Sequence, residues 1–283
     1  MVKISIIIPC YNTHTYLDFT LESIKNQTFR DYEIIIVNDG SCNPETISYL
    51  TKLPSDIIVI NQKNKGLSAA RNTGIEKANG YYCLPLDCDD WLAPNFLEKT
   101  ISLLKESHEN TYAYSYMKLE GEENSILTKS YNFFEQLFTN QIPYCILMPK
   151  FMWENLGGYD EYMTNGYEDW EFNIRLGING YFGVVVPSPL FHYRVSSQGM
   201  LKSISQSSHF DLWKYIQNKH YSYFEYSKMY ELWKFWKNRK STYPLTILFL
   251  WWIFSNNMPN WICNYILKIW LKRRLIKIIK NIY

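Results

Sequence analysis

The stretch Tyr81-Tyr82-Cys83-Leu84-Pro85-Leu86-Asp87-Cys88-Asp89-Asp90 decides the fold, because an apolar run ends abruptly in three carboxylates. The apolar part predicts a buried β-strand. Clustered carboxylate oxygens suit Mg²⁺ or Mn²⁺, and these ions usually hold substrate phosphates as well. A solvated acidic turn is the alternative for an isolated Asp-x-Asp. A calcium EF-hand loop is excluded, because the glycine and the final glutamate that it requires are missing.

Further apolar runs upstream alternate with helical patterns. We expect strands at residues 3–9, 34–37 and 57–60, and helices over residues 17–24, over residues 45–50 and from residue 66 onward. Continuous apolar strands separated by helices predict an α/β fold with a buried, mostly parallel sheet. Ligands of such sheets bind beyond the carboxyl ends of the strands. Tyr11-Asn12, Asn38-Asp39 and Asp87 to Asp89 follow three of these strands, so we expect them to meet in one crevice.

Four blocks of sequence carry a resemblance to a known family. They are residues 5–12, 37–41, 64–74 and 86–90, and both their order and their spacing match. Together they resemble the family-2 glycosyltransferases of GT-A fold, over roughly residues 3–195. The resemblance implies a Rossmann-like, mostly parallel sheet flanked by helices. It also implies an inverting transfer of a sugar from a nucleotide diphosphate donor.

The resemblance assigns donor binding to residues near the strand ends. Asp39 resembles the carboxylate that accepts the uracil N–H of a UDP donor, which is a charge-assisted hydrogen bond. Its alternative is a turn-former before Gly40. Arg71 resembles the arginine that contacts the base or the diphosphate, and its alternative is a surface arginine on a helix. The full set of expected donor-binding residues is Pro9, Tyr11, Asn12, Asp39, Arg71 and Asp87.

The cofactor expected from these residues is Mn²⁺ or Mg²⁺. Asp89 is the principal predicted metal ligand, with Asp87 and His192 as further ligands. His192 follows a strand-like run at residues 183–187, and a neutral imidazole is a competent ligand. A core or loop histidine remains the alternative. Asp90 is expected to orient the acidic loop or to cap the next helix.

Two later blocks resemble the acceptor side of the family. Residues 155–161 resemble a flexible acceptor loop, whose paired glycines allow unusual backbone angles. Residues 166–172 contain the Glu-Asp motif, in which Asp169 would be the general base that takes the proton of the attacking hydroxyl. The alternative is a set of acidic residues that complement a helix dipole. Trp170 either stacks on a sugar or packs against the sheet. The residues assigned to acceptor contact or to support are Gly158, Glu168, Trp170 and Arg194.

The charge of the chain is distributed unevenly. The net charge is +2, but residues 232–283 hold ten Lys or Arg and no acidic residue, which leaves −8 for residues 1–231. Six of the ten tryptophans also follow residue 231. We therefore expect a catalytic domain at residues 1–200 and a helical, aromatic and basic region at residues 201–283. Such a region predicts contact with an anionic membrane surface. A cover for the core or a homo-oligomer contact is the alternative.

Several features of the sequence predict a protein at the cytoplasmic side of a membrane. The apolar run at residues 245–254 is too short to span a bilayer, which takes roughly 20 residues. No signal peptide is evident, and the six scattered cysteines predict reduced thiols. We expect a cytoplasmic protein, peripheral at the inner face of the cell membrane. Nucleic acid is not expected as a partner, because the site is lined by carboxylates.

The predicted function is an inverting glycosyltransferase of bacterial-type surface polysaccharide synthesis. It would move a hexose or N-acetylhexosamine from a UDP-sugar to a hydroxyl of a glycan or lipid-linked acceptor. One alternative is a polyprenyl-phosphate sugar transferase of the same fold, which needs no base. Another is a non-catalytic relative that binds a nucleotide or a glycan. A nicotinamide dehydrogenase is excluded, because no G-x-G-x-x-G follows the first strand.

Overall fold

The computed structural model describes residues 3–196 and 208–258, together with residues 262, 265, 266 and 269. The first sheet in this part of the chain has five strands in the order β3-β2-β1-β4-β8. Four of them are parallel, namely β1 (Ile4–Cys10), β2 (Tyr32–Asp39), β3 (Ile57–Gln62) and β4 (Tyr82–Pro85), and β8 (Met148–Pro149) is antiparallel. The intervening helices are α1 (Leu17–Lys25), α2 (Pro44–Thr51) and α3 (Leu67–Lys77). The predicted α/β fold with a mostly parallel sheet is confirmed.

Strand β1 forms the centre of this sheet and is buried along its whole length. Ile6 and Ile8 pack into one core cluster, and Ile7 packs into the other, because successive side chains of a strand point to opposite faces. Helix α3 lies very close to this strand. A Cβ atom at Gly74 would lie 2.4 Å from Cγ2 of Ile7, so this helical glycine permits the close packing.

The register of the sheet aligns the strand ends that carry the predicted site. Cys10 pairs with Asn38, and Asp39 pairs with Gln62. On the other side of β1, Ile7 pairs with Pro85, shortly before the acidic loop. The three predicted loops therefore lie at the same edge, as the rule for parallel sheets requires.

A second sheet of four strands, in the order β5-β9-β6-β7, lies beside the first. The sequence predicts only a part of this sheet, at residues 183–187. Its strands are β5 (Trp91–Leu92), β6 (Thr111–Gly121), β7 (Ser125–Leu127) and β9 (Phe182–Val195). Pro187 and Pro189 interrupt the pattern of β9 near a register irregularity, and this hides the strand in the sequence. The helices that lie between β5 and β9 in the sequence are α4 (Phe96–Lys105), α5 (Phe133–Gln136), α6 (Lys150–Leu156) and α7 (Glu168–Ile178).

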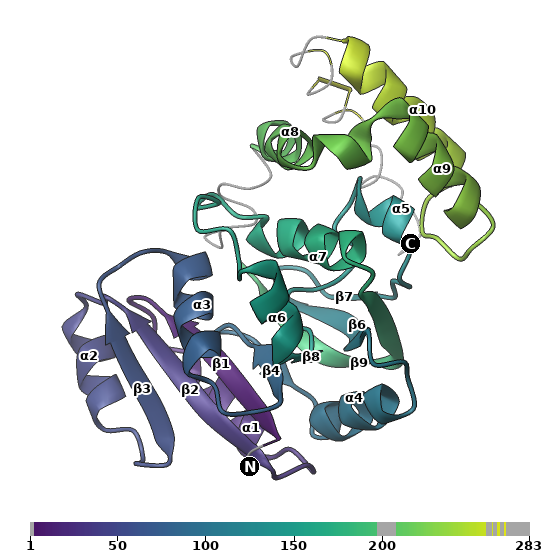
Figure 1. Ribbon diagram of the computed structural model, residues 1–283. Coiled ribbons are helices and arrows are strands. Elements are labelled where there is room, and N and C mark those ends of the chain that lie inside the picture. Colours follow the sequence, from purple (N-terminus) through teal and green to yellow (C-terminus); the bar gives the residue numbers. More distant parts are fainter. Residues whose placement is uncertain (1–2, 197–207, 259–261, 263–264, 267–268, 270–283) are drawn as a thin grey trace.

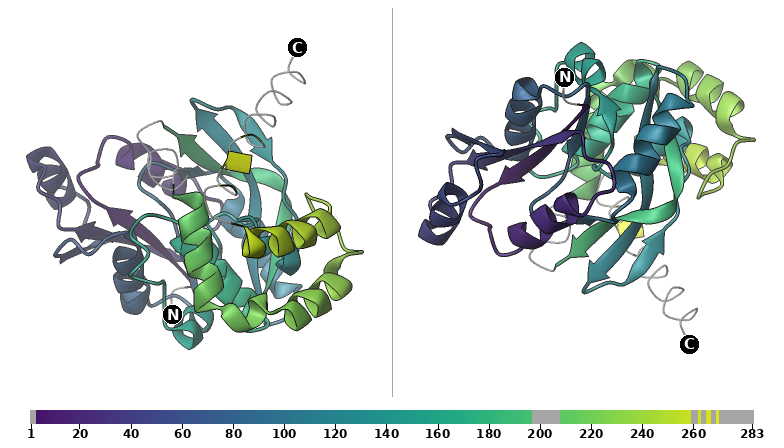
Figure 2. Two further views of the ribbon diagram at one scale, coloured as in Figure 1. Left: turned by 90° about the horizontal axis from the view of Figure 1, so that it is seen from above. Right: turned by 90° about the horizontal axis from the view of Figure 1, so that it is seen from below.

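Residues 208–258 form three α-helices and one 3-10 helix. They are α8 (His209–Lys219), the 3-10 helix η2 (Tyr221–Phe224), α9 (Tyr226–Trp236) and α10 (Leu245–Asn257). Figure 1 shows these helices above α5 and α7, away from β1–β3, and Figure 2 shows the same layer from two other sides. Phe134 and Trp170 share one apolar cluster with Trp213 and Phe249. Helices α8 to α10 therefore pack against helices that precede residue 196.

Other predictions for the C-terminal region meet the structure only in part. In the described ranges, no helix has the length and apolar character needed to cross a membrane. The six Lys and Arg of the expected basic region that follow residue 267 lie outside the described residues. The five described cysteines (Cys10, Cys42, Cys83, Cys88 and Cys145) are free thiols.

Candidate active site

The loop after β1 is fastened to the loop after β2 by Asn12. Asn12 has a φ of 52°, and its side-chain oxygen accepts hydrogen bonds from the backbone N–H groups of Cys42 at 2.7 Å and Asn43 at 2.9 Å. Pro9 is buried within β1, whereas Tyr11 is 50% exposed. Of these three predicted donor-binding residues, Tyr11 presents the largest free surface. Asn12 shapes the loop that carries it.

Asp39 holds the chain just before α3. Its carboxylate accepts hydrogen bonds from the backbone N–H groups of Lys65 at 2.9 Å and Gly66 at 2.8 Å, and from the Gln62 amide at 2.7 Å. Asp39 is only 3% exposed. A carboxylate offers about four acceptor positions, so three donors leave capacity for one more. Contact with a nucleotide base stays a prediction.

Arg71 joins three segments that lie far apart in the sequence. One guanidinium nitrogen is 2.8 Å from Oδ1 of Asp87, and another is 2.6 Å from Oε1 of Glu168. The side chain is 1% exposed, which rules out the surface-arginine alternative. Burial by itself lowers the pKa of Arg71, but the charges of Asp87 and Glu168 raise it well above its usual value. Arg71 is therefore a permanent cation between the acidic loop and the Glu-Asp motif.

Asp90 and Tyr144 hold the acidic loop, residues 87–90, through hydrogen bonds. Asp90 is 1% exposed and accepts hydrogen bonds from the Tyr144 hydroxyl and from the backbone N–H of Arg194, the latter at 2.7 Å. The Tyr144 hydroxyl accepts the backbone N–H of Asp87 at 2.9 Å. Arg194 also donates from Nε to the backbone oxygen of Asp89 at 3.1 Å. These contacts fix the loop and leave Asp87 and Asp89 partly exposed.

Asp87 and Asp89 have the electrostatic character of a cation site. Burial, followed by the charge of Asp87, raises the pKa of Asp89 to about 6, and Arg194 offsets only part of this. A divalent cation that takes its other ligands from phosphate and water would stabilise both anions. Binding of Mg²⁺ or Mn²⁺ by these two aspartates stays a prediction.

The predicted third metal ligand, His192, is engaged elsewhere. Its ring stacks on Trp91 with centroids 5.3 Å apart, and its Nδ1 lies 2.9 Å from Oε1 of Glu120. Among all described residues, no three His, Cys, Asp or Glu side chains gather as a metal site. The expected set of Asp87, Asp89 and His192 is thus not assembled. The reason is that β9 pairs His192 with β5, beside Glu120 of β6.

Asp169 lies in the first turn of α7 and is partly exposed. Its Oδ2 accepts a hydrogen bond from the Asn140 amide at 2.7 Å, and its Oδ1 accepts the backbone N–H of Trp170 at 2.8 Å. Burial and then the charge of Glu168 raise the pKa of Asp169 to about 7, while Arg71 and Asn140 offset only part of the shift. A carboxylate with this pKa is suited to accept a proton near neutral pH.

The neighbours of Asp169 differ from the expected acceptor contacts. Trp170 is 1% exposed, its indole N–H donates to the backbone oxygen of Gln136 at 2.6 Å, and its ring stacks on His209. Its ring therefore has no free face for a sugar, and it packs between α5 and α8 instead of against the sheet. Glu168 is 5% exposed and is paired with Arg71, which makes it a supporting residue.

The loop with paired glycines is firmly anchored. The Asn72 side chain accepts the backbone N–H of Tyr159 at 2.7 Å and donates to the backbone oxygen of Tyr159 at 2.9 Å. Gly158 has a φ of +81°, and a Cβ there would lie 2.7 Å from Oδ1 of Asn72. Gly158 thus permits a close approach between the loop and α3.

Several residues that build the site are not predicted by the sequence. Asn72 lies inside one of the four quoted blocks but carried no assigned role. Asn140 and Tyr144 lie between α5 and β8, in a segment without a motif or periodic pattern. Only the tertiary structure brings these side chains to the aspartates.

Comparison with known proteins now identifies the family. The family described as Glycosyl transferase family 2 matches residues 5–159, which is more than half of the chain. The chain belongs to glycosyl transferase family 2. The match includes Asp39, Arg71 and Asp87 of this family-2 chain, whereas Asp169 lies beyond it.

Named relatives support the same assignment. The family-2 chain is 30% identical over 219 residues to EpsH of Bacillus subtilis (strain 168), covering 68% of this chain and 60% of EpsH. It is 29% identical over 187 residues to chondroitin synthase of Escherichia coli, covering 63% of this chain and 27% of the synthase. The chain therefore spans less than two thirds of the length of either relative.

A solved structure shows the same fold. The crystal structure of S. aureus TarS 1–349 in complex with UDP-GlcNAc superimposes with a TM-score of 0.61 at 19% identity. The superposition covers 76% of this family-2 chain and 65% of that chain. The GT-A fold expected from the sequence is confirmed.

Proposed function

We propose that this family-2 glycosyltransferase moves a hexose or N-acetylhexosamine from a UDP-sugar to an acceptor hydroxyl, with inversion. The observation that carries the proposal is Asp169, a partly exposed carboxylate whose pKa is raised to about 7. It lies beside the cluster in which Arg71 joins Asp87 to Glu168. The complex of TarS with UDP-GlcNAc supports the donor class. The similarity to chondroitin synthase supports an acceptor in polysaccharide synthesis.

The proposed reaction is an in-line displacement. Asp169 accepts the proton of the acceptor hydroxyl while the hydroxyl oxygen attacks the anomeric carbon. The bond from that carbon to the diphosphate breaks, and its electron pair leaves with the diphosphate. Attack comes from the opposite face, so an α-linked donor gives a β-linked product. Mn²⁺ or Mg²⁺, when bound at Asp87 and Asp89, would neutralise the charge of the diphosphate.

We further propose that the acceptor is a glycan or lipid-linked molecule at the cytoplasmic face of a membrane. Helix α9 and the segment after it carry Lys234, Lys237, Arg239 and Lys240, which are exposed and form no ion pair within the described residues. Phe235 and Ile247 nearby in sequence are each 61% exposed. Cations beside exposed apolar side chains favour the surface of an anionic bilayer.

The proposal is tested with purified protein, Mn²⁺ and a panel of nucleotide-sugars. Released nucleotide diphosphate identifies the donor, and NMR of the product from an octyl glycoside acceptor gives the anomeric configuration. We expect release from a UDP-sugar, loss of release with EDTA, and an inverted product. Retention of configuration, or full activity in EDTA, would contradict the proposal.

The variant Asp169→Asn separates the alternatives. A hydroxyl acceptor needs the base, so transfer to it should fall by at least about 100-fold, whereas a polyprenyl-phosphate acceptor needs no base and should retain much of its transfer. If the wild-type protein turns over no donor with any acceptor but binds UDP in calorimetry, the chain is a non-catalytic relative.

A further inference from the structure

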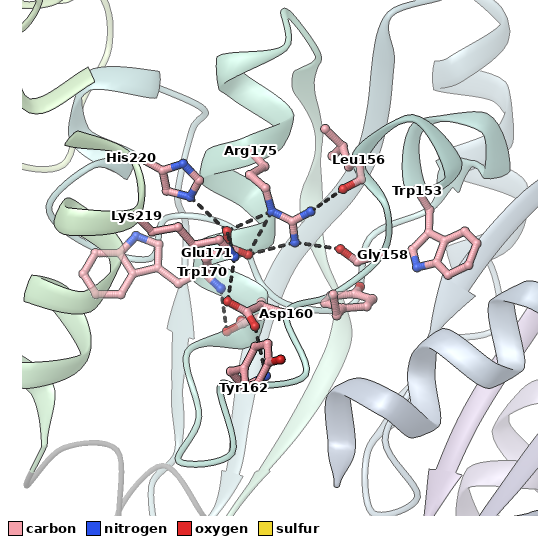
Figure 3. Close-up of polar contacts among 12 residues, drawn as sticks. Trp153, Leu156, Gly158, Asp160, Tyr162, Trp170, Glu171, Arg175, Lys219 and His220 are labelled. Atoms are coloured by element: carbon pink, nitrogen blue, oxygen red, sulfur yellow. Dashed lines mark hydrogen bonds and ion pairs between the residues drawn. The ribbon is translucent and has the colours of Figure 1, made fainter. Parts of the chain in front are cut away.

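The feature that the proposed reaction leaves unused is a set of charged side chains around Glu171, between α7 and α8. Figure 3 shows Glu171 and Arg175 of α7 facing Lys219 and His220 at the end of α8, with Asp160 of the glycine loop beside them. We call these five side chains the loop clamp. In the part of the chain that the structure describes, none of these five side chains forms a hydrogen bond or ion pair with Asp169, so the clamp acts at a distance from the proton transfer.

Arg175 connects the catalytic helix to the glycine loop. Its Nε and one terminal nitrogen bind the Glu171 carboxylate at 2.8 to 2.9 Å. Its terminal nitrogens also donate to the backbone oxygens of Leu156 at 2.8 Å and Gly158 at 2.7 Å. These two carbonyls flank Gly157, whose φ is +72°. Because the guanidinium is a rigid planar fork, it fixes the loop turn relative to α7.

Glu171 is the anion that holds Arg175 in place. Its side chain is 0% exposed. Its Oε1 also lies 2.9 Å from Nζ of Lys219 and 2.9 Å from Nε2 of His220. Burial by itself raises the pKa of Glu171, but the hydrogen bond from His220 and the charges of Arg175 and Lys219 lower it to about 2. Glu171 is therefore ionised throughout the physiological range.

The same lysine reaches the far side of the loop. Lys219 Nζ lies 2.6 Å from Oδ2 of Asp160, which also accepts the Tyr215 hydroxyl at 2.9 Å. Both donors belong to α8. The loop is thus held by α7 through its carbonyls and by α8 through Asp160.

A third helix, α3, also contacts the glycine loop. Asn72 of α3 binds the backbone of Tyr159, and the Tyr159 ring stacks on Phe172 of α7 with centroids 4.4 Å apart. The Arg71 guanidinium lies 5.7 Å from the centre of the same ring. The loop therefore connects the Arg71 cluster, the helix of Asp169 and the C-terminal helices.

We propose that the loop clamp is a positioning device for the acceptor, with Arg175 as its central residue. It holds residues 156–160 at a fixed distance from the amino end of α7, where Asp169 takes the acceptor proton. Helix α8 is then part of the acceptor side of the enzyme, and disturbance of the clamp affects acceptor use and spares donor binding. The inference rests on the proposed transfer reaction.

The test compares Arg175→Lys with the wild-type protein. Lysine keeps the charge but loses the fork, so residues 156–160 shift relative to Asp169. A misplacement of about 1 Å reduces rates by about 100-fold in enzymes generally. We expect kcat/KM for the octyl glycoside to fall about 10- to 100-fold. The affinity for UDP with Mn²⁺ and the rate of acceptor-free donor hydrolysis should stay within about twofold of wild type.

Two further variants keep the test falsifiable. Arg30→Lys is the matched control, because Arg30 is an exposed arginine that donates to a backbone oxygen, that of Lys25, away from the clamp. It should leave every constant unchanged. Tyr215→Phe removes only one hydroxyl from Asp160 and should give a smaller loss in the same direction. If kcat/KM for the octyl glycoside and the rate of donor hydrolysis fall by the same factor, and this factor equals the loss of folded protein, Arg175 has a purely structural role. That result would overturn the inference.

An independent readout separates failure of the inference from failure of the proposed function. Amide hydrogen exchange of residues 156–162 needs no substrate. Faster exchange in Arg175→Lys, with unchanged exchange in β1, is expected whether or not transfer is detected. Unchanged exchange in residues 156–162 overturns the clamp, whereas absence of transfer in the wild type overturns the proposed function alone.

Discussion

At the scale of single residues, the surroundings of Asp169, the proposed base, raise its pKa. Its carboxylate is desolvated and lies beside the charge of Glu168, and both effects disfavour the anion. Since the pKa is raised to about 7, only the form present above that pH accepts a proton. The same shift means that ionisation of Asp169 works against the folded state. Its contribution to stability is therefore present at acid pH and is lost as the pH rises through about 7.

The pH dependence of transfer follows directly. We expect kcat/KM to rise between about pH 6 and pH 8, and Asp169→Asn to lower it by roughly 100- to 10,000-fold, as is usual for loss of a general base. Initial rates with the identified UDP-sugar, measured in constant ionic strength buffers, give the profile. Circular dichroism in the same buffers controls for unfolding. A flat profile would argue against Asp169 as the base.

Arg71 gives the second prediction at this scale. Arg71→Gln leaves Asp87 and Glu168 as unpaired carboxylates, one of them buried, and such losses reduce the free energy of unfolding by about 3–5 kcal/mol. Because Arg71 also lowers the pKa of Asp169, the rise in rate should move to higher pH. Urea denaturation and the rate profile measure the two effects. Arg30→Gln, at an exposed site, should change neither the free energy of unfolding nor the pH profile of the rate. An equally small effect of Arg71→Gln would disprove the ion pairs of Arg71 with Asp87 and Glu168.

At the scale of elements, α7 and α8 are joined by a buried charge as well as by apolar packing. Glu171→Gln should lower the free energy of unfolding at pH 7 by about 1–3 kcal/mol, because cationic donors lose their anion. Because the pKa of Glu171 is lowered, the direction in which its contribution to stability changes with pH is fixed. Its contribution is present above its ordinary pKa of 4.5 and is lost as the pH falls toward about 2.

Denaturant midpoints at several pH values between neutrality and pH 3 check this prediction. The difference between Glu171→Gln and wild type should shrink below about pH 4.5. The exposed Glu225→Gln on the chain just before α9 provides the control and should show no pH-dependent difference. A difference that stays constant with pH would mean that Glu171 acts through shape alone.

At the scale of the whole molecule, the helices of the basic and aromatic C-terminal region have one buried face and one exposed face. The faces that carry Trp213, Trp236 and Phe249 are buried against α5 and α7. Residues such as Phe235 and Leu250 remain exposed, at 61% and 59%. The core-cover alternative therefore accounts for one face of these helices, and the membrane proposal concerns the other.

Vesicle binding tests the membrane proposal. We expect the protein to sediment with phosphatidylglycerol vesicles and not with phosphatidylcholine vesicles, with release at high salt. Each cation near an anionic surface contributes about 1 kcal/mol, so changing Lys234, Lys237 and Lys240 to Gln should weaken binding by about 100-fold. The same change at the exposed Lys63, Lys77 and Lys105 is the charge-matched control. Equal effects of both triple variants would refute a specific face.

The sequence by itself determined the central sheet, the strand-end loops and the acidic loop. The reason is that the buried strands β1, β2 and β4 appear in the sequence as continuous apolar runs. Each run is followed at once by the polar residues of the loop at the strand end. Of the second sheet, the sequence predicts only residues 183–187, because Pro187 and Pro189 interrupt the pattern of β9. Tertiary structure alone decided that His192 faces Glu120, that Trp170 is buried, and that Arg71 pairs with Glu168, 97 positions away. Ion pairs and raised pKa values depend on distances between remote segments, and no local pattern encodes those distances.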